Sequence, residues 1–181
     1  MPVQLHMRRG LSNQPETFVP GGYVLRTITH SDVAHWVSLL DRNGELGRWD
    51  LDRARSLFAP GSPMPLDGSF LVSRDGTPVA TAQLHLRTAP DDPYSPVPEL
   101  GWVSVLPEHR GLHLGRTVCS AVLHYAAEQG HRAVFLRTDD HRLPAIRTYL
   151  RLGFEPWFYD PSAPERWRAV MANWPDVIVR G

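Results

Sequence analysis

The sequence has few of the features that would tie a chain to a membrane, to nucleic acid or to an oxidising compartment. It contains one cysteine in 181 residues, so no internal disulfide can form, and a reducing cytoplasm is the expected location. Nineteen basic residues balance nineteen acidic ones, which gives no sign of a nucleic-acid backbone or an anionic membrane as a partner. No apolar run has the length of a membrane span, and the first residues lack the apolar segment of a signal peptide. We therefore expect a cytoplasmic protein that binds neither nucleic acid nor membrane.

The sequence also lacks the spacing of a metal site. His109 and His113 lie four residues apart, and Asp139, Asp140 and His141 follow later in the chain. His109 precedes the expected helix, so the two histidines do not share a helical face. We expect no metal ion.

The composition and the positions of the prolines predict one globular domain with long loops. Apolar residues make up 42% of the chain and charged residues 21%, and seventeen prolines mark the connections. Residues 1–22 are polar and broken by prolines, so we expect an extended, weakly ordered N-terminal arm. The main domain is expected over residues 23–160, and a C-terminal helix and tail over residues 161–181.

The first part of the main domain mixes strands and helices. Alternation and helical periodicity predict a strand over residues 23–29, a helix that ends at Gly44, a short helix over residues 50–58 and a hairpin around Asp75-Gly76. A proline-rich loop over residues 88–98 follows, and its length makes it a candidate wall of a substrate site.

The stretch from Glu99 to Gly130 contains a complete strand, turn and helix. A bulky apolar run stops at Pro107, and from Leu114 the apolar positions recur every four residues until Gly130 ends the pattern. The glycines in the turn let the backbone approach a ligand closely, and the free N–H groups of the first helical turn favour a negative group. This stretch is therefore predicted to bind a phosphate.

The spacing of this turn separates three kinds of phosphate-binding loop. A P-loop needs four residues between its glycines and then Lys-Ser/Thr, and a dinucleotide-binding loop needs G-x-G-x-x-G; neither is present. The turn has the pattern R-G-x-x-x-G, from Arg110 to Gly115, and it follows a strand. This pattern resembles motif A (Q/R-x-x-G-x-G/A) of the GNAT superfamily of N-acetyltransferases. Arg110, His113 and Gly115 fall on its three defined positions, and His113 departs from the glycine that the family prefers.

A second motif supports this resemblance. The segment from Pro144 to Phe154 resembles motif B of the same superfamily, N-x-x-A-x-x-[LF]-Y-x-x-x-G-F, with Ala145, Tyr149 and Gly153 in register. Arg142 stands where the family often has asparagine. The segment around this motif is also similar to mycothiol-synthase-like members of the superfamily.

The resemblance implies an α/β (α+β) fold of the GNAT type, whose mixed central β-sheet is flanked by helices and splays apart at the cofactor site. It implies that acetyl-CoA is the cosubstrate and lies in the gap. Backbone groups of Val103, Ser104 and Val105 would bind the pantetheine arm, and Arg142 and Ala145 are assigned to the cofactor site as well. The pyrophosphate would be held by Arg110, Gly111, Leu112, His113, Leu114, Gly115 and Arg116.

Two residues are implied as catalytic. Tyr149 matches a tyrosine that commonly protonates the departing thiolate, and its alternative role is that of a core tyrosine. Glu99 begins the splayed strand, where several members carry a glutamate that takes a proton from the amine, and its alternative role is that of a surface glutamate at a strand end. Ser104, acting through water, is a further alternative.

The predicted function is transfer of the acetyl group of acetyl-CoA to a primary amine of a small molecule or peptide, by direct attack on the thioester. Two alternatives stay open, namely a CoA-binding regulatory module without catalysis and a transferase of a different acyl group. The sequence does not identify the acceptor amine. It also leaves the oligomeric state open, with a homodimer as one alternative.

Overall fold

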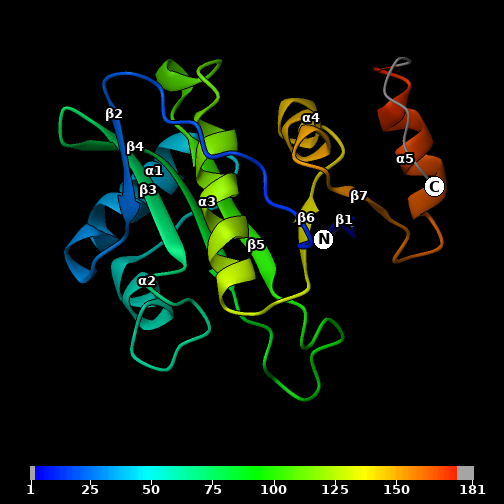
Figure 1. Cartoon of the computed structure of the whole chain (residues 1–181), viewed down its shortest axis with the longest axis horizontal. Helices are drawn as coiled ribbons and strands as arrows, with labels where there is room; N and C mark the ends of the chain where they lie inside the picture. Colours follow the sequence, from blue (N-terminus) through cyan, green and yellow to red (C-terminus); the bar gives the residue numbers. More distant parts are fainter. Residues whose placement is uncertain (1–2, 175–181) are drawn as a thin grey trace.

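The computed structural model describes residues 3–174 and shows seven strands and five α-helices in that range (Figure 1). Two short 3-10 helices, η1 and η2, complete it. In chain order the elements are β1 (Leu5–Gly10), β2 (Tyr23–Thr27), η1 (His30–Asp32), α1 (Val33–Asn43), α2 (Leu51–Leu57), β3 (Ser69–Arg74), β4 (Thr77–His85), β5 (Glu99–Val105), η2 (Pro107–His109), α3 (Leu114–Glu128), β6 (Ala133–Thr138), α4 (Leu143–Arg151), β7 (Glu155–Trp157) and α5 (Ala163–Met171).

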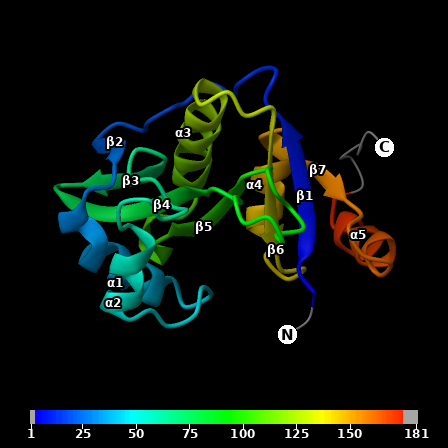
Figure 2. The same ribbon diagram turned by 90° about the horizontal axis from the view of Figure 1, so that it is seen from below.

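The strands form one mixed sheet in the order β2-β3-β4-β5-β6-β1-β7. Neighbouring strands are antiparallel except β5 and β6, which are parallel. Figure 2 shows α3 and α4 on one face of the sheet and α1 and α2 on the other, with α5 beside the β7 edge. The predicted α/β architecture with helices on both faces is confirmed.

The structure corrects the expectation for the first residues of the chain. Residues 5–10 form β1, which pairs with β6 on one side and with β7 on the other, so they are not a weakly ordered arm. Leu5 and Met7 are fully buried. Neighbouring Arg8 and Arg9 hide this apolar alternation in the sequence, and pairing with strands more than a hundred residues away decides the conformation.

Residues 11–22 are extended, as expected, but side chains of α3 hold them in place. The Thr117 hydroxyl donates to the carbonyl of Phe18 at 2.7 Å, and the His124 ring lies 2.8 Å from the carbonyl of Pro15. This segment therefore crosses the outer face of α3 on its way from β1 to β2 (Figure 1).

The predicted helices and turns between residues 23 and 86 are confirmed. Helix α1 ends where Gly44 adopts a left-handed backbone with φ of 77°, and Asp50 caps α2 by accepting a hydrogen bond from the Arg53 amide at 2.7 Å. Asp75 and Gly76 both have positive φ, as a tight hairpin turn requires.

Among residues 3–174, no helix combines the length and the hydropathy that a membrane crossing would need. The predicted C-terminal helix is α5. The last residues of the predicted tail, 175–181, lie outside the described part of the chain.

Candidate active site

The parallel strands β5 and β6 separate almost where they begin. In the described chain their register consists of one pair, Glu99 opposite Phe135. Beyond this pair β5 and β6 no longer pair with each other, although β5 still pairs with β4 and β6 with β1. This separation confirms the predicted splay of the sheet. The backbone N–H and C=O groups along that edge of β5 therefore face a gap and can bind an extended ligand.

A β-bulge in β5 lies beside this gap. Thr81 of β4 is opposite Ser104, whereas Gln83 is opposite Gly101, so β5 contains one residue more than β4 over this step. Within it Trp102 has a φ of 48°, in the left-handed region. A bulge leaves backbone groups without their usual partners and turns the side chains next to it.

The turn between β5 and α3 contains two residues with left-handed backbone. Gly111 has a φ of 81° and His113, the N-cap of α3, has a φ of 60°. Glycine adopts this conformation without strain, whereas a residue with a side chain pays roughly 1–2 kcal/mol. This backbone requirement explains why motif A has glycine at the position that His113 occupies here.

The N-terminus of α3 supplies backbone donors to the same place. Its first helical hydrogen bond runs from the Thr117 amide to the carbonyl of His113 at 3.0 Å. The amides of Leu114, Gly115 and Arg116 therefore have no acceptor within the helix. Together with the dipole of this 15-residue helix, they favour an anionic group in front of the turn.

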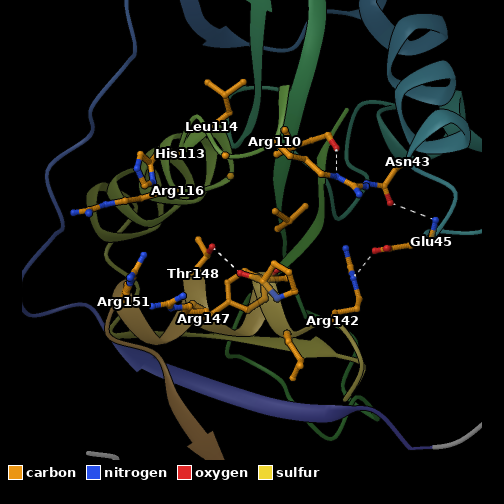
Figure 3. Close-up of a pocket in the computed structure, with 18 of the residues that line it drawn as sticks. Asn43, Glu45, Arg110, His113, Leu114, Arg116, Arg142, Arg147, Thr148 and Arg151 are labelled. Carbon is orange, nitrogen blue, oxygen red and sulfur yellow. Dashed lines mark hydrogen bonds and ion pairs between the residues drawn. The ribbon is translucent and has the colours of Figure 1, made fainter. Parts of the chain in front are cut away.

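A cavity of about 770 Å³ lies beside the open edge of β5, between β5, α3 and α4 (Figure 3). Its size is in the usual range for a small-molecule site. The walls come from five places in the chain: β5, the turn and start of α3, α4, the end of α1, and the residues after α5. The lining residues are Asn43, Glu45, Val103, Val105, His109, Arg110, Gly111, His113, Leu114, Gly115, Arg116, His141, Arg142, Leu143, Pro144, Ala145, Arg147, Thr148, Tyr149, Arg151, Asn173 and Trp174.

Positive charge dominates this lining. Five arginines line the cavity, and in the described residues one carboxylate, that of Glu45, lines it too. Arg142 Nε lies 3.0 Å from Glu45 Oε2, which pairs these two charges. The remaining four arginines, at positions 110, 116, 147 and 151, have no acidic partner among residues 3–174. Such a set of free guanidinium groups suits a ligand with several negative charges.

Most of the predicted cofactor residues come together on this lining. Ten of them line the cavity: Val103, Val105, Arg110, Gly111, His113, Leu114, Gly115, Arg116, Arg142 and Ala145. Ser104 does not, because it alternates with its neighbours along β5, and its buried hydroxyl has no partner in the described residues. Leu112 points outward and is 42% exposed. Within residues 3–174, no group of three His, Cys, Asp or Glu side chains is arranged to hold a metal ion.

Tyr149 lies on α4 and contributes to the cavity wall, although only 3% of its surface is exposed. Burial raises the pKa of its hydroxyl well above the ordinary value, and the neighbouring Cys119 adds to this shift. An ordinary tyrosine hydroxyl is already protonated at neutral pH, and the shift holds the proton more tightly. A group that holds its proton and faces a ligand cavity can act as a proton donor.

Glu99 has a different setting from the one expected of a base. Arg137 donates to its carboxylate from Nε at 2.7 Å and from a terminal nitrogen at 3.0 Å, and Arg87 donates at 3.3 Å. Burial alone would raise the pKa of Glu99, but His85 and the two arginines outweigh it and hold the pKa below its usual value. Glu99 is also absent from the cavity lining. Its contacts are those of a buried ion-pair cluster at the closed end of the gap.

Sequence reasoning did not single out several residues of this site. Arg147 and Arg151 lie four positions apart on α4, so they share a helical face, and that spacing was a readable signal. Asn43 and Glu45 gave no such signal, because their place in the cavity depends on how the end of α1 packs near α4.

A ligand that fills this cavity must offer hydrogen-bonding groups to the edge of β5 and negative charge to α3 and the arginines. Coenzyme A has both, since its pantetheine arm carries amides and its other end carries phosphates. The fold and this lining therefore define the class of protein as one with a splayed mixed sheet and a cavity that fits a ligand of the coenzyme A type.

Comparison with known proteins identifies the family within this class. Residues 34–154 match the model of the acetyltransferase (GNAT) family, and the chain belongs to that family. The mycothiol acetyltransferase of Thermomonospora curvata is 34% identical over 165 residues, which cover 87% of this chain and 53% of the relative. The chain thus spans about half the length of the curated relatives that it matches.

Solved structures show the same fold. A GCN5-related N-acetyltransferase from Sphaerobacter thermophilus superposes with a TM-score of 0.70 at 19% identity, covering 87% of this chain and 50% of the other. A putative acetyltransferase from Salmonella typhimurium, solved with its cofactor acetyl-CoA, gives a TM-score of 0.61 at 19% identity over 74% of this chain and 79% of the other. The predicted GNAT fold is confirmed.

Proposed function

We propose that this chain transfers the acetyl group of acetyl-CoA to a primary amine of a small molecule or peptide. The observation that carries the proposal is the cavity between β5 and α4. Free backbone donors, four arginines without an acidic partner in the described residues, and the protonated Tyr149 share this space. These are the groups needed to bind the cosubstrate and to release its thiolate.

The residues present fit acetyl-CoA along the whole length of the cavity. The edge of β5 at Val103 and Val105 offers backbone groups to the pantetheine amides, although the carbonyl of Val105 accepts a long hydrogen bond from Arg110 Nε at 3.4 Å. The amides at the start of α3 would hold the pyrophosphate, and Arg116 would add positive charge beside them. Arg147 and Arg151 supply positive charge on the opposite wall, which suits the additional phosphate on the ribose.

Acetyl-CoA supplies the acetyl group as a thioester, which an uncharged amine can attack directly. Tyr149 then donates its proton to the departing sulfur, since its hydroxyl is protonated at neutral pH and the residue lines the cavity. The amine itself must lose a proton before it attacks, because alkyl amines are protonated at neutral pH. The role of Glu99 as the acceptor of that proton stays a prediction, and its two arginine partners argue against it.

Between a small molecule and a peptide as the acceptor we favour a small molecule, since relatives 34% and 33% identical to this chain are named for mycothiol. This chain spans only about half of those relatives, so the particular acceptor is not carried over from them.

Release of free CoA from acetyl-CoA tests the proposed function. The protein is incubated with acetyl-CoA and, one at a time, glucosamine, ethanolamine, benzylamine, neamine and a peptide with a free α-amino group. Release matched by an N-acetylated product in mass spectrometry supports amine acetylation. Binding of acetyl-CoA without release across the panel indicates a regulatory module, and faster release from propionyl-CoA indicates a different acyl donor.

A further inference from the structure

The cavity is electrically polar along its length. Figure 3 shows Arg116, Arg147 and Arg151 facing one another across one end, whereas Asn43, Glu45 and Arg142 meet at the other, with the guanidinium of Arg110 beside Asn43. Four guanidinium groups without acidic partners in the described residues repel a cation from most of the cavity. Glu45 is the one carboxylate on the described part of the lining, so it marks the place where a cation is best tolerated.

The chain holds Glu45 in position from its backbone. Gly44 and Gly47 have positive φ, so the loop after α1 turns sharply on both sides of Glu45. The side-chain oxygen of the buried Asn43 accepts a hydrogen bond from the Glu45 amide at 3.3 Å. The carboxylate is therefore presented to the cavity by a fixed turn, although its side chain is still 43% exposed.

In this structure the carboxylate of Glu45 forms an ion pair with Arg142. The guanidinium of Arg142, 12% exposed, reaches from the N-cap of α4 and bonds Glu45, a residue 97 positions earlier in the chain. An ion pair with one partner this exposed contributes little to stability, so a second cation can replace the first at small cost. An alkyl ammonium group has the same charge and three donors for the same two oxygens.

We propose that Glu45 binds the protonated amine of the acceptor, and that Arg142 is the internal counter-ion which the amine displaces. This inference rests on the proposed amine acetylation and names the charge that selects the acceptor. The acceptor is a primary amine that arrives as a cation at the end of the cavity opposite Arg116, Arg147 and Arg151. Glu45 is thus a binding residue for the acceptor.

Kinetics of three variants test this assignment. Glu45→Gln keeps the shape of the side chain and removes its charge, so KM for the amine should rise tenfold or more while KM for acetyl-CoA stays within about twofold. Arg142→Gln frees Glu45, and KM for the amine should fall. Glu108→Gln is the matched control, because Glu108 also pairs with an arginine, Arg42, but does not line the cavity.

A purely structural role predicts another pattern. If the Glu45–Arg142 pair only held the two walls together, both substitutions would break it. KM for the amine would then rise in both variants. Equal increases in the two variants, or an unchanged KM in Glu45→Gln, would overturn the proposal.

A binding measurement keeps this inference separate from the proposed function. Benzylamine and benzyl alcohol are titrated into the CoA-saturated wild-type protein by calorimetry at pH 7. The wild type should bind the amine at least tenfold more tightly than the alcohol, and Glu45→Gln should lose that preference. A preference for benzylamine without any turnover would retain Glu45 as an ammonium site while rejecting acetylation. A wild type without preference would reject the site.

Discussion

Glu99 and Phe135 form the one register pair that joins β5 to β6 in the described chain, and the sheet opens directly beyond them. Everything assigned to the cosubstrate lies on the open side of this pair, on β5, α3 and α4. The ion-pair cluster of Glu99 lies at the closed end. The point at which the strands part therefore separates residues that bind a ligand from residues that hold the sheet together.

Gly115 tests the anion site at the start of α3. A Cβ at this position would meet Val105 at 3.6 Å, which is an ordinary contact, so Gly115→Ala should fold normally. Gly115→Glu places bulk and negative charge in front of the free amides and should abolish CoA binding. In thermal unfolding, CoA at a hundredfold excess over its Kd should stabilise the wild type by about 2–3 kcal/mol and leave Gly115→Glu unchanged. Stabilisation of the glutamate variant would place the phosphates elsewhere.

Arg147 and Arg151 test the second anion site on α4. Replacing either by glutamine removes a charge-assisted hydrogen bond to a phosphate, which should weaken CoA binding about tenfold. Dephospho-CoA, which lacks the ribose phosphate, should bind both variants as well as it binds the wild type. Arg168→Gln is the control, since Arg168 is exposed on α5 and does not line the cavity. Equal losses for the two ligands, measured by calorimetry, would assign these arginines to the pyrophosphate.

The sequence was sufficient for the parts of the site that depend on local pattern. Arg110, Gly115 and Tyr149 stand in two short motifs, each contained in one turn or one helix, so their spacing determines their geometry. His113 departs from its motif, and its left-handed backbone shows that the turn keeps the geometry for which glycine is preferred.

Contacts between distant segments could not be predicted in this way. The pairing of β1 with β6 joins Leu5 to Thr138, and no local signal in a polar N-terminal segment indicates such a partner. The ion pair of Glu45 with Arg142 and that of Glu99 with Arg137 likewise depend on packing between elements. Glu99 is the clearest case, because its position suggested a base and its partners are two arginines.

Tyr149 tests the proton donor. Tyr149→Phe keeps the ring among its neighbours, including Phe154 with ring centres 6.1 Å apart, and removes the hydroxyl alone. Turnover should fall roughly tenfold or more, while the Kd of CoA changes little. Rapid-mixing measurement of CoA release, with calorimetry of CoA binding as the control, distinguishes these effects. Full activity in the phenylalanine variant would make Tyr149 a core residue.

Glu99→Gln first tests the stability that the ion-pair cluster contributes. The pKa of Glu99 is lower in the folded protein than its reference value of 4.5, so its stabilisation is complete above that value and is lost as the pH falls through the folded-state pKa. The glutamine variant leaves Arg137 without its carboxylate, whereas Arg87 keeps its ion pair with Asp92 at 2.7 Å, and it should be less stable by about 2–3 kcal/mol at pH 7. Chemical denaturation should show this difference shrinking toward pH 3. A constant difference would mean that packing, and not charge, holds the cluster.

The same variant decides whether Glu99 takes a proton from the amine. If Glu99 were the base, Glu99→Gln would remove it. The acid limb of the kcat/KM profile would then disappear, and activity would recover at high pH, where the amine deprotonates without help. A carboxylate whose pKa is held below its usual value by two guanidinium groups is a weak base, and Glu99 does not line the cavity. We therefore expect the profile of kcat/KM against pH to keep its shape in the variant, with a lower amplitude if the sheet loosens around Phe135. Loss of the acid limb alone, in a variant as stable as the wild type, would instead restore Glu99 as the base and require the cluster to open when the acceptor binds.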